Sequence, residues 1–509
     1  MGLGLNGGGE SSVRFFLKHG AYVTVTDMKN RDGLLPTIKS LESDPSLDKT
    51  RLTYVLGEHR VEDFSEADCV IKNPGIKYDG NKFLAAAKVI ETDLSIFLHF
   101  TKSPIIAVTG SKGKSSTVSA IQYGLEKAGF ISFSGGNITV SPLSFLEKTN
   151  EKTIVVLELS SWQLADLRGR AVLRPHIAVI TKIVPDHQNF YHSMEAYIAD
   201  KKLIYADQTE NDFTIIDADE DEPGSGPSNG STWGTVFAAE TKGLVLNYSR
   251  RPLPHGILGV WQETAADGSF HGVARLPRTM LSSAAQKNMD DTETILGPLA
   301  VPGDHMKTNV LNAALVLRLM KIAPEKIIRI LGNWEGLPHR LQYFFSWTPD
   351  QQKNAGIKTR LRSVKFYNDS CATVPEAAAA ASQAFGHPVI LLCGGTEKGL
   401  SMAPLAASLS CHHHEMPVKS LYLLAGSATD ELCTLLRKYK VSYNGPYPSL
   451  EDMLTAVKRK LSETASSSLL QTDETIVFSP GATSFGMFIN EFDRGTKFME
   501  TVRQLFGTA

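Results

Sequence analysis

Residues 108–117, VTGSKGKSST, carry the clearest chemical pattern in this sequence. A buried-strand pattern leads into them and a helical pattern follows, so the backbone N–H groups and Lys114 are placed to bind phosphate at a helix N-terminus. A full nucleotide-binding loop, G-x-x-x-x-G-K-[ST], would have glycine where this chain has Val108. We therefore predict a shortened phosphate loop in which Ser115 is a Mg²⁺ ligand. The residues that we assign to the nucleotide phosphates are Gly110, Ser111, Lys112, Gly113, Lys114, Ser115 and Ser116.

Two other interpretations of this loop are disfavoured. A plain glycine-rich turn would not need a strand before it and a helix after it. A GTPase switch is suggested by D-x-x-G at residues 166–169 and by Thr181-Lys182, which could begin a guanine-reading [NT]-K-x-D motif. Position 184 is valine, so the guanine motif fails.

A second glycine-rich segment opens the chain. Gly2, Gly4 and Gly7 fit G-x-G-x-x-G, and Asp27 ends the following strand pattern 20 residues after Gly7. Read alone, this pattern predicts dinucleotide binding. The strand that should precede Gly2 is missing, so we expect a truncated or misassigned start and a weakened first domain.

Composition excludes several classes of protein. The 52 basic and 54 acidic residues nearly balance, so no overall field favours nucleic acid or an anionic membrane. Five cysteines without a C-x-x-C pair argue against a disulfide framework or zinc ribbon and for a reducing compartment. No apolar run approaches the ~18 to 20 residues of a membrane span, and the start lacks a signal-peptide pattern. We expect a cytoplasmic, monomeric protein without nucleic-acid binding or membrane insertion.

The order of the elements predicts the fold class. Strand and helix patterns alternate in three successive blocks, which indicates an α/β protein with parallel sheets and helices on their faces. We predict three domains: a Rossmann-like domain over residues 1–98, a P-loop ATPase-like domain over 99–337, and a second Rossmann-like domain over 338–509. From about residue 219 to 300 the pattern weakens, and we expect an irregular insertion of short strands and surface loops.

Short segments spread over nearly the whole chain resemble the Mur ligases, the ATP-dependent enzymes that add amino acids to the peptidoglycan precursor. Beside the loop GSKGKS they are GLGLNGGG (2–9), NPGI (73–76), GGN (135–137), ELSSWQL (158–164), PDHQNFY (185–191), YIADK (197–201), GDHMKTN (303–309), GLPHR (336–340), YNDSCAT (367–373), GGTEK (394–398), SPGATSFGMF and NEFDRG (479–495). Each segment alone is weak, but their order and spacing together are strong. The resemblance is to the members that add D-glutamate to UDP-N-acetylmuramoyl-L-alanine.

The resemblance implies a metal site beside the phosphate loop. Glu158 and His187 follow two predicted strands, at the edge where α/β sheets collect ligands, and their oxygen and imidazole groups suit magnesium or manganese. By resemblance they bind the metal together with Ser115. Lys201 matches the lysine that carries a carbamate in this family; its neighbour Lys202 fits less well. The catalytic residues implied are Lys114, Glu158, His187 and Lys201.

The resemblance also assigns three substrate sites. For the ATP base and ribose it implicates His305, Asn309, Arg340 and Asp369, whose wide separation in sequence implies domain closure over ATP. For the UDP substrate, bound by the first domain in place of NAD, it implicates Leu5, Asn6, Asp27, Asn73, Pro74, Gly75 and Asn137. For D-glutamate it implicates Thr373, Lys398, Ser484 and Phe492.

This chain departs from the family pattern at one chemically important position. Family members usually have N-D-S-K-A-T, whereas this chain has Cys371 in the lysine position. A thiol does not supply a fixed cation, so the affinity for the glutamate carboxylate or the choice of amino acid is open. The run CHHHE at 411–415 is expected to be an exposed loop, because consecutive side chains diverge and cannot all bind one ion.

The function implied by the resemblance is ATP-dependent amide ligation through an acyl phosphate, which attaches D-glutamate to UDP-N-acetylmuramoyl-L-alanine. The alternatives are another ligase of the superfamily, for a different precursor step or of the folylpolyglutamate synthase type, and a nucleotide-binding relative without activity. A UDP-type domain before the ATP loop argues against the folate enzyme.

Overall fold

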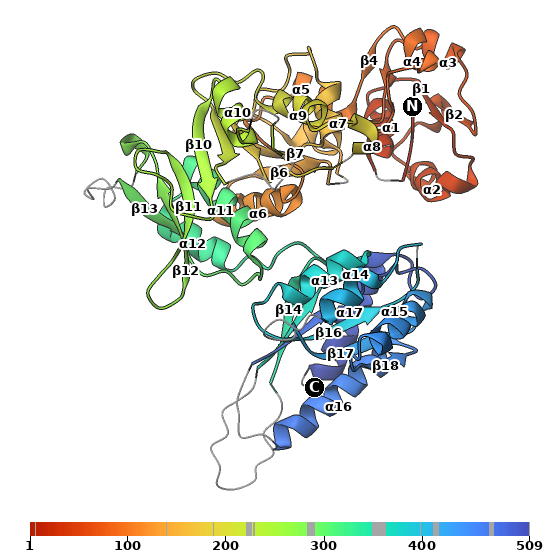
Figure 1. Cartoon of the computed structure of the whole chain (residues 1–509). Helices are drawn as coiled ribbons and strands as arrows, with labels where there is room; N and C mark the ends of the chain where they lie inside the picture. Colours follow the sequence, from red (N-terminus) through yellow and green to blue (C-terminus); the bar gives the residue numbers. More distant parts are fainter. Residues whose placement is uncertain are drawn as a thin grey trace. The chain divides into compact units, whose positions relative to one another are not determined.

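The structure is a computed structural model of the 509-residue chain. It describes residues 1–5, 7–138, 140–186, 188–219, 226–227, 230–281, 291–348, 363–397, 399–410, 417–467 and 473–507. These residues form two compact units, the first comprising Met1–Pro298 with Thr308–Gly332 and the second Leu299–Lys307 with residues from Asn333 onward. Both are built mainly from parallel strands and helices, which confirms the α/β class (Figure 1).

The N-terminal part of the first unit contains two separate two-stranded parallel sheets, β1–β2 and β3–β4. Two of its helices begin at polar side-chain caps: Asn81 caps α4, and Thr92 forms a reciprocal capping box with Ser95 at α5. The elements are α1 (Gly8–Lys18), β1 (Val23–Asp27), α2 (Leu35–Ser43), β2 (Leu52–Leu56), α3 (Glu62–Ser65), β3 (Val70–Ile71), α4 (Lys82–Ala86), β4 (Ile90–Glu91) and α5 (Asp93–Phe100).

The rest of the first unit is organised around a nine-stranded sheet in the order β13-β12-β11-β10-β9-β8-β5-β7-β6. The pairings from β6 to β11 in this order are all parallel, whereas β12 pairs antiparallel with both β11 and β13. The strands at its centre are fully buried and apolar except at two C-terminal ends, Thr109 of β5 and Glu158 of β7, as expected where helices cover both faces of a parallel sheet. These elements are β5 (Ile105–Thr109), α6 (Lys114–Ala128), β6 (Ser132–Gly136), β7 (Ile154–Glu158), α7 (Ser161–Asp166), β8 (Ile177–Ile180), α8 (Gln188–Tyr191), α9 (Met194–Lys201), β9 (Phe213–Asp217), α10 (Trp233–Glu240), β10 (Leu244–Ser249), β11 (Gly259–Thr264), β12 (Phe270–Arg275), β13 (Thr292–Leu296), α11 (Asp304–Leu319) and α12 (Pro324–Gly332).

The stretch from about 219 to 300, for which the sequence indicates short strands and loops, is built onto this sheet. Its described residues form α10 and the strands β10 to β13, which extend the sheet beyond β9. Trp233 and Phe237 of α10 pack into the same core as β5 and β7. The extension is therefore part of the central sheet.

The second unit holds a six-stranded sheet in the order β14-β15-β19-β16-β17-β18, parallel except for β14. Two buried apolar clusters contain residues from both its strands and its helices. The elements are β14 (Gln342–Trp347), β15 (Val364–Asn368), α13 (Pro375–Gln383), β16 (Val389–Gly394), α14 (Ala403–Leu409), β17 (Val418–Leu424), α15 (Ser427–Lys438), β18 (Asn444–Tyr447), α16 (Leu450–Ser467), β19 (Glu474–Phe478) and α17 (Glu491–Phe506).

Among the described helices, none combines the length and the apolar character that are needed to cross a membrane.

Candidate active site

The predicted phosphate loop joins β5, which ends at Thr109, to α6, which begins at Lys114. Gly110 and Gly113 have backbone φ values of 141° and 95°, which residues other than glycine rarely adopt. A Cβ on Gly110 would lie 2.0 Å from the Thr181 side chain, and one on Gly113 would lie 2.4 Å from Asn309 Oδ1. Both positions thus require glycine, because neighbouring atoms leave no room for a side chain and because the backbone conformation disfavours one.

Lys114 lies against the backbone of its own loop. Its Nζ donates to the carbonyl oxygens of Gly110 at 3.0 Å and Ser111 at 3.1 Å. Ser115 and Ser116 follow in the first turn of α6, where both are half-buried. The cation, a serine hydroxyl and a helix N-terminus are therefore close together, as phosphate binding requires.

Lys201, the predicted carbamate lysine, is also at this loop. It is 1% exposed, and its Nζ donates to Gly110 O at 2.9 Å. Burial, with the nearby Lys114 ammonium, lowers the pKa of Lys201 well below its usual value. Lys202 instead forms an ion pair with Glu240 at 2.6 Å. Of the two lysines, Lys201 is therefore the one at the loop, and its carbamate stays a prediction.

Glu158, at the end of β7, is 1% exposed and belongs to the strand beside β5. Its Oε1 accepts a hydrogen bond from Asn137 Nδ2 at 2.8 Å, and its main-chain oxygen accepts one from Asn137 N at 2.9 Å. Its Oε2 is buried and has no hydrogen-bond partner among the described residues. A buried carboxylate oxygen left without a partner is costly, so this oxygen suits a cation.

The remaining predicted metal ligand, His187, lies outside the described residues, and the histidines, cysteines and acids within them form no cluster of three. The neighbouring Asp186 is described, with its Oδ2 3.7 Å from Lys112 Nζ.

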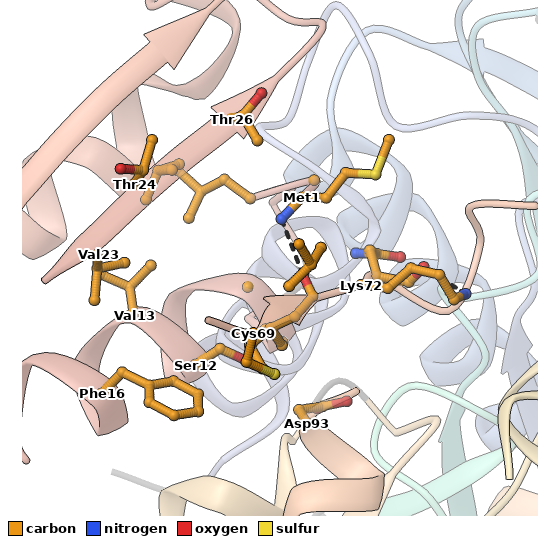
Figure 2. A pocket seen from close by; sticks show the side chains of 18 of the residues that line it. Met1, Ser12, Val13, Phe16, Val23, Thr24, Thr26, Cys69, Lys72 and Asp93 are labelled. Atoms are coloured by element: carbon orange, nitrogen blue, oxygen red, sulfur yellow. Dashed lines mark hydrogen bonds between the residues drawn. The ribbon is translucent and has the colours of Figure 1, made fainter. Parts of the chain in front are cut away.

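The residues predicted to bind the UDP substrate line two cavities in the N-terminal part. Asp27 Oδ2 accepts from Gly4 N at 3.2 Å, and Asp27 and Asn73 both line a cavity of about 680 Å³. Asn73, Pro74, Gly75 and Asn137 line a second cavity of about 920 Å³, shown in Figure 2. Asn137 therefore connects the predicted substrate region to Glu158. Leu5 is 51% exposed, and Asn6 lies outside the described residues.

Lys72 has a structural role that its sequence pattern did not signal. Its side chain is fully buried, and Nζ donates to the carbonyl oxygens of Asn73 at 3.2 Å, Pro74 at 3.4 Å and Ile76 at 2.9 Å. It also forms an ion pair with Asp166 of α7 at 2.9 Å. Lys72 thus fixes the predicted UDP loop, although the sequence alone showed only a lysine beside a strand.

The residues predicted to bind the nucleotide base and ribose are divided between the two units. In the first unit, the Asn309 side chain lies against Gly113, as described above. His305, Arg340 and Asp369 belong to the second unit. Asp369 is buried there, and its carboxylate accepts from Ser479 Oγ at 2.6 Å and Leu341 N at 3.1 Å. Burial raises the pKa of Asp369 to about 7.

Two of the predicted D-glutamate residues lie in loops at one edge of the second sheet, and Phe492 lies in the first turn of α17. Thr373 and Ser484 belong to the loops that follow the adjacent parallel strands β15 and β19. Ser484 is buried, and Phe492 is 54% exposed with its ring 5.8 Å from that of His339. Lys398 lies outside the described residues.

Arg494 holds these two loops together and was not among the predicted site residues. It is 1% exposed and donates to Ser370 O at 2.7 Å, Ala482 O at 2.9 Å and Thr483 O at 2.8 Å. Burial lowers the pKa of Arg494 to about 10. The motif NEFDRG contained this arginine, but a sequence does not show which of several charged residues is buried.

Comparisons with known proteins agree with this geometry. Residues 1–92 match the MurD-like N-terminal domain of Mur ligases, and residues 108–228 match the Mur ligase middle domain. The UDP-N-acetylmuramoylalanine–D-glutamate ligase of Treponema pallidum is 38% identical over 99% of this chain and 97% of its own length. The enzyme of that name from Borreliella afzelii is 33% identical over the same shares.

Solved structures show the same fold at low sequence identity. The UDP-N-acetylmuramate-alanine ligase MurC of Thermotoga maritima aligns with a TM-score of 0.54 at 15% identity, covering 99% of this chain and 98% of that one. MurF of the same organism, in complex with ADP, aligns with a TM-score of 0.50 at 13% identity over 95% of both chains. With relatives of 38% and 33% identity along nearly its whole length and two matching domains, this chain belongs to the Mur ligase family.

Proposed function

We propose that this protein is an ATP-dependent ligase that attaches D-glutamate to UDP-N-acetylmuramoyl-L-alanine in peptidoglycan precursor synthesis, forming ADP and phosphate. The observation that carries the proposal is the grouping of Lys114, Lys201 and Glu158 around a shortened phosphate loop. The names of the relatives support the choice of substrates.

The chemistry requires that the carboxylate of the substrate first becomes an acyl phosphate. The carboxylate oxygen attacks the γ-phosphorus of ATP and ADP leaves; the amine of D-glutamate then attacks the acyl carbon, and phosphate leaves with loss of a proton. Lys114 and the N–H groups of the loop stabilise the negative charge on the transferred phosphoryl group. Asn137 donates to Oε1 and to the main-chain oxygen of Glu158 and also lines the cavity of about 920 Å³, which supports a substrate carboxylate bound next to the loop.

The residues present fit a divalent cation. The unpartnered Glu158 Oε2 is an oxygen ligand in need of a positive partner, and Ser115 and His187 would complete its site. Magnesium, or manganese, would supply charge neutralisation for the crowded phosphate oxygens. Asn137 fixes the position and the orientation of the Glu158 carboxylate through its hydrogen bond to Oε1.

Lys201 fits a carbamate. Its lowered pKa favours the neutral amine, which can add to carbon dioxide with loss of one proton to give a carbamate anion. The new carboxylate would lie beside Gly110 and close to Lys114, where an anion offsets the ammonium charge.

The remaining assignments follow from this reaction. We propose that the domain of residues 1–98 binds the UDP group, that residues 99–337 bind ATP, and that residues 338–509 bind D-glutamate together with the nucleotide base. Because ATP and the nucleotide-activated precursor are reactants, we propose that the protein acts in the cytoplasm. We also propose that it acts as a monomer.

The test is phosphate release with purified protein, ATP, Mg²⁺ and UDP-N-acetylmuramoyl-L-alanine, over a panel of amino acids. We expect release with D-glutamate, and a loss of about 10³-fold or more in Lys114→Ala, because a positioned cation is removed from the transition state. Lys127→Ala, on the exposed C-terminal turn of the same helix, is the matched control and should remain active. Release only with L-lysine or diaminopimelate would contradict the acceptor, and nucleotide binding without any release would contradict catalysis.

A further inference from the structure

Ser111 belongs to the phosphate loop, yet its N–H and hydroxyl groups bond to other segments of the chain. The residue is 5% exposed. Its N–H donates to Lys182 O at 2.9 Å, and its Oγ donates to Val184 O at 2.8 Å. The same Oγ accepts from Val184 N at 3.1 Å and lies 3.1 Å from Tyr197 Oη. Ser111 therefore contacts both the segment that follows β8 and the helix α9.

The hydrogen-bonding capacity of this hydroxyl is fully used. A serine hydroxyl has one proton to donate and two lone pairs that accept. The proton is given to Val184 O, and one lone pair accepts from Val184 N. The bond to Tyr197 must then be donated by the tyrosine, which occupies the second lone pair. Because the N–H of Ser111 is also engaged, both donors of this residue are taken up within the described part of the chain and are not offered to a phosphate oxygen.

Through Val184, Ser111 holds the start of the loop that leads to His187. Two residues, Pro185 and Asp186, separate Val184 from His187, which lies outside the described residues. Ser111 binds both the N–H and the C=O of Val184, so the backbone is fixed on either side of that residue. The ring of Pro185 fixes the next φ angle. Ser111 therefore sets the position from which the chain continues toward the predicted metal ligand.

Through Tyr197, the contacts of Ser111 extend to the predicted carbamate lysine. Tyr197 is 1% exposed and lies four residues before Lys201 on α9, so the two side chains share one face of the helix. Lys201 Nζ lies 4.4 Å from the centre of the Tyr197 ring. It also donates to the carbonyl oxygen of Gly110, the neighbour of Ser111. Two adjacent residues of the loop thus hold the end of α9.

The fragment Thr181-Lys182, which begins but does not complete a guanine motif, belongs to the same set of contacts. Lys182 O accepts from the N–H groups of Ser111 and Lys112, at 2.9 and 3.2 Å. Thr181 Oγ1 donates to Thr109 O at 3.0 Å, where β5 ends and the loop begins. These bonds explain the fragment as a support of the phosphate loop.

We propose that Ser111 is a positioning residue, whose side chain binds no phosphate and instead joins the phosphate loop to the chain that leads to His187 and to the helix of Lys201. This inference rests on the proposed function and deepens it, because these positions matter through the metal and the transferred phosphoryl group. It revises the sequence assignment of Ser111 to the nucleotide phosphates. The N–H groups at the start of α6, from Gly113 to Ser116, keep that role.

The experiment compares Ser111→Ala with Ser111→Thr, which keeps the hydroxyl. Binding of Mn²⁺ alone is followed by the loss of the EPR signal of the free ion. We expect its Kd to rise about 10-fold in Ser111→Ala, because the partners that orient a metal site are removed, and to stay within about 2-fold of the wild type in Ser111→Thr. Unchanged Mn²⁺ affinity in Ser111→Ala would overturn the proposal.

Nucleotide affinity distinguishes positioning from phosphate binding. The Kd for ADP, measured by calorimetry in EDTA, should be the same in the wild type and Ser111→Ala, because no phosphate contact is lost. A rise of about 10-fold or more would show that the hydroxyl binds phosphate, since a hydrogen bond to a charged group is worth about that much, and would overturn the proposal. Tyr197→Phe is a milder second variant that removes only one of the bonds to Ser111 Oγ, so it should weaken Mn²⁺ binding less than Ser111→Ala and leave ADP binding unchanged.

Ser103→Ala is the matched control for protein stability. Ser103 is also buried, and its Oγ donates to Asn150 O at 2.8 Å, at the end of β5 opposite the phosphate loop. We expect this control to keep the Mn²⁺ affinity of the wild type. An equal loss in Ser103→Ala and Ser111→Ala would show a general effect of destabilisation and would refute positioning. Both binding measurements need no turnover, so they stay separate from phosphate release by the wild type, which tests the proposed function.

Discussion

Lys72 Nζ and Asp166 Oδ2 form an ion pair at 2.9 Å, with the lysine side chain fully buried and that of the aspartate 5% exposed. The pair joins the strand that leads into the predicted UDP loop to the last residue of α7, a helix that begins three residues after Glu158. Burial lowers the pKa of Lys72 and raises the pKa of Asp166 to about 6, and the attraction between the two side chains opposes both shifts. The predicted UDP loop and the helix that follows Glu158 are thereby held in one arrangement.

We expect Lys72→Met to raise KM for the UDP substrate about 10-fold and to leave KM for ATP unchanged. The reason is that the ammonium holds three carbonyl oxygens of residues 73–76, each hydrogen bond to a charged group contributing about 1.5 kcal/mol or more. Steady-state kinetics with each substrate varied in turn measure this difference.

The double variant Lys72→Met/Asp166→Asn distinguishes a loss of protein stability from a loss of loop positioning. Lys72→Met alone leaves a buried carboxylate unpaired, which costs about 3–5 kcal/mol, and the double variant removes that charge. We expect the double variant to recover stability in urea unfolding while keeping the high KM. A KM that recovers together with stability would show that Lys72 has only a structural role.

Glu158→Gln should weaken activation by Mg²⁺, because an amide oxygen is a poorer ligand than the carboxylate whose Oε2 has no partner among the described residues. We expect the Mg²⁺ concentration for half-maximal activity to rise at least 10-fold. Asn137→Ala should raise it less, because this change leaves the ligand in place and removes only its orienting hydrogen bond. Equal Mg²⁺ dependence in the wild type and Glu158→Gln would remove Glu158 from the metal site.

Much of the first unit's site could be predicted from sequence because its residues are local to strand ends. Gly110, Gly113 and Lys114 are contiguous, and Glu158 ends a strand next to theirs, so the general rule for sheet edges places them together. The contact of Lys201 with Gly110 joins residues 91 positions apart, and only the resemblance indicated it.

The parts that sequence did not predict depend on burial of charge and on strand order. Nothing in the local sequence distinguishes Lys72 or Arg494 from the many exposed cations, because their roles arise from loops that approach in three dimensions. The weak pattern from about 219 to 300 likewise could not show that its strands extend the central sheet, since pairing partners are not encoded by periodicity. The three predicted domain boundaries stay a prediction.

Lys201 should carry a carbamate in protein supplied with ¹³C-labelled bicarbonate, seen as one carbamate carbon resonance by NMR. Lys201→Arg should lose this signal, because a guanidinium stays protonated and does not add to carbon dioxide. Lys202→Arg should keep it, since Lys202 forms an ion pair with Glu240 away from the loop. A signal that survives in Lys201→Arg would place the modification elsewhere.

Cys371→Lys should lower KM for D-glutamate about 5-fold or more. Burial raises the pKa of the Cys371 thiol to about 11, so at neutral pH the wild type presents no charge at this position. Cys371→Met is the matched control, since it lengthens the side chain without charge. If both variants change KM equally, the effect is one of shape, and a cation at this position is not used for the acceptor carboxylate.

Asp369 should make the stability of the protein depend on pH in a defined window. Its pKa is raised to about 7 in the folded protein, whereas an unfolded aspartate titrates near ~3.9, so the folded state binds the extra proton between these values. The contribution of Asp369 to the free energy of unfolding is therefore fully present below about pH 4. It is lost as pH rises toward about 7, by about 1 kcal/mol per pH unit. Asp369→Asn removes the titration, so the difference in unfolding free energy between wild type and variant should shift with this slope from pH 5 to pH 7 in urea titrations. A difference that stays constant over that interval would show that Asp369 remains ionised in the folded protein, with Ser479 and Leu341 stabilising the carboxylate through their hydrogen bonds.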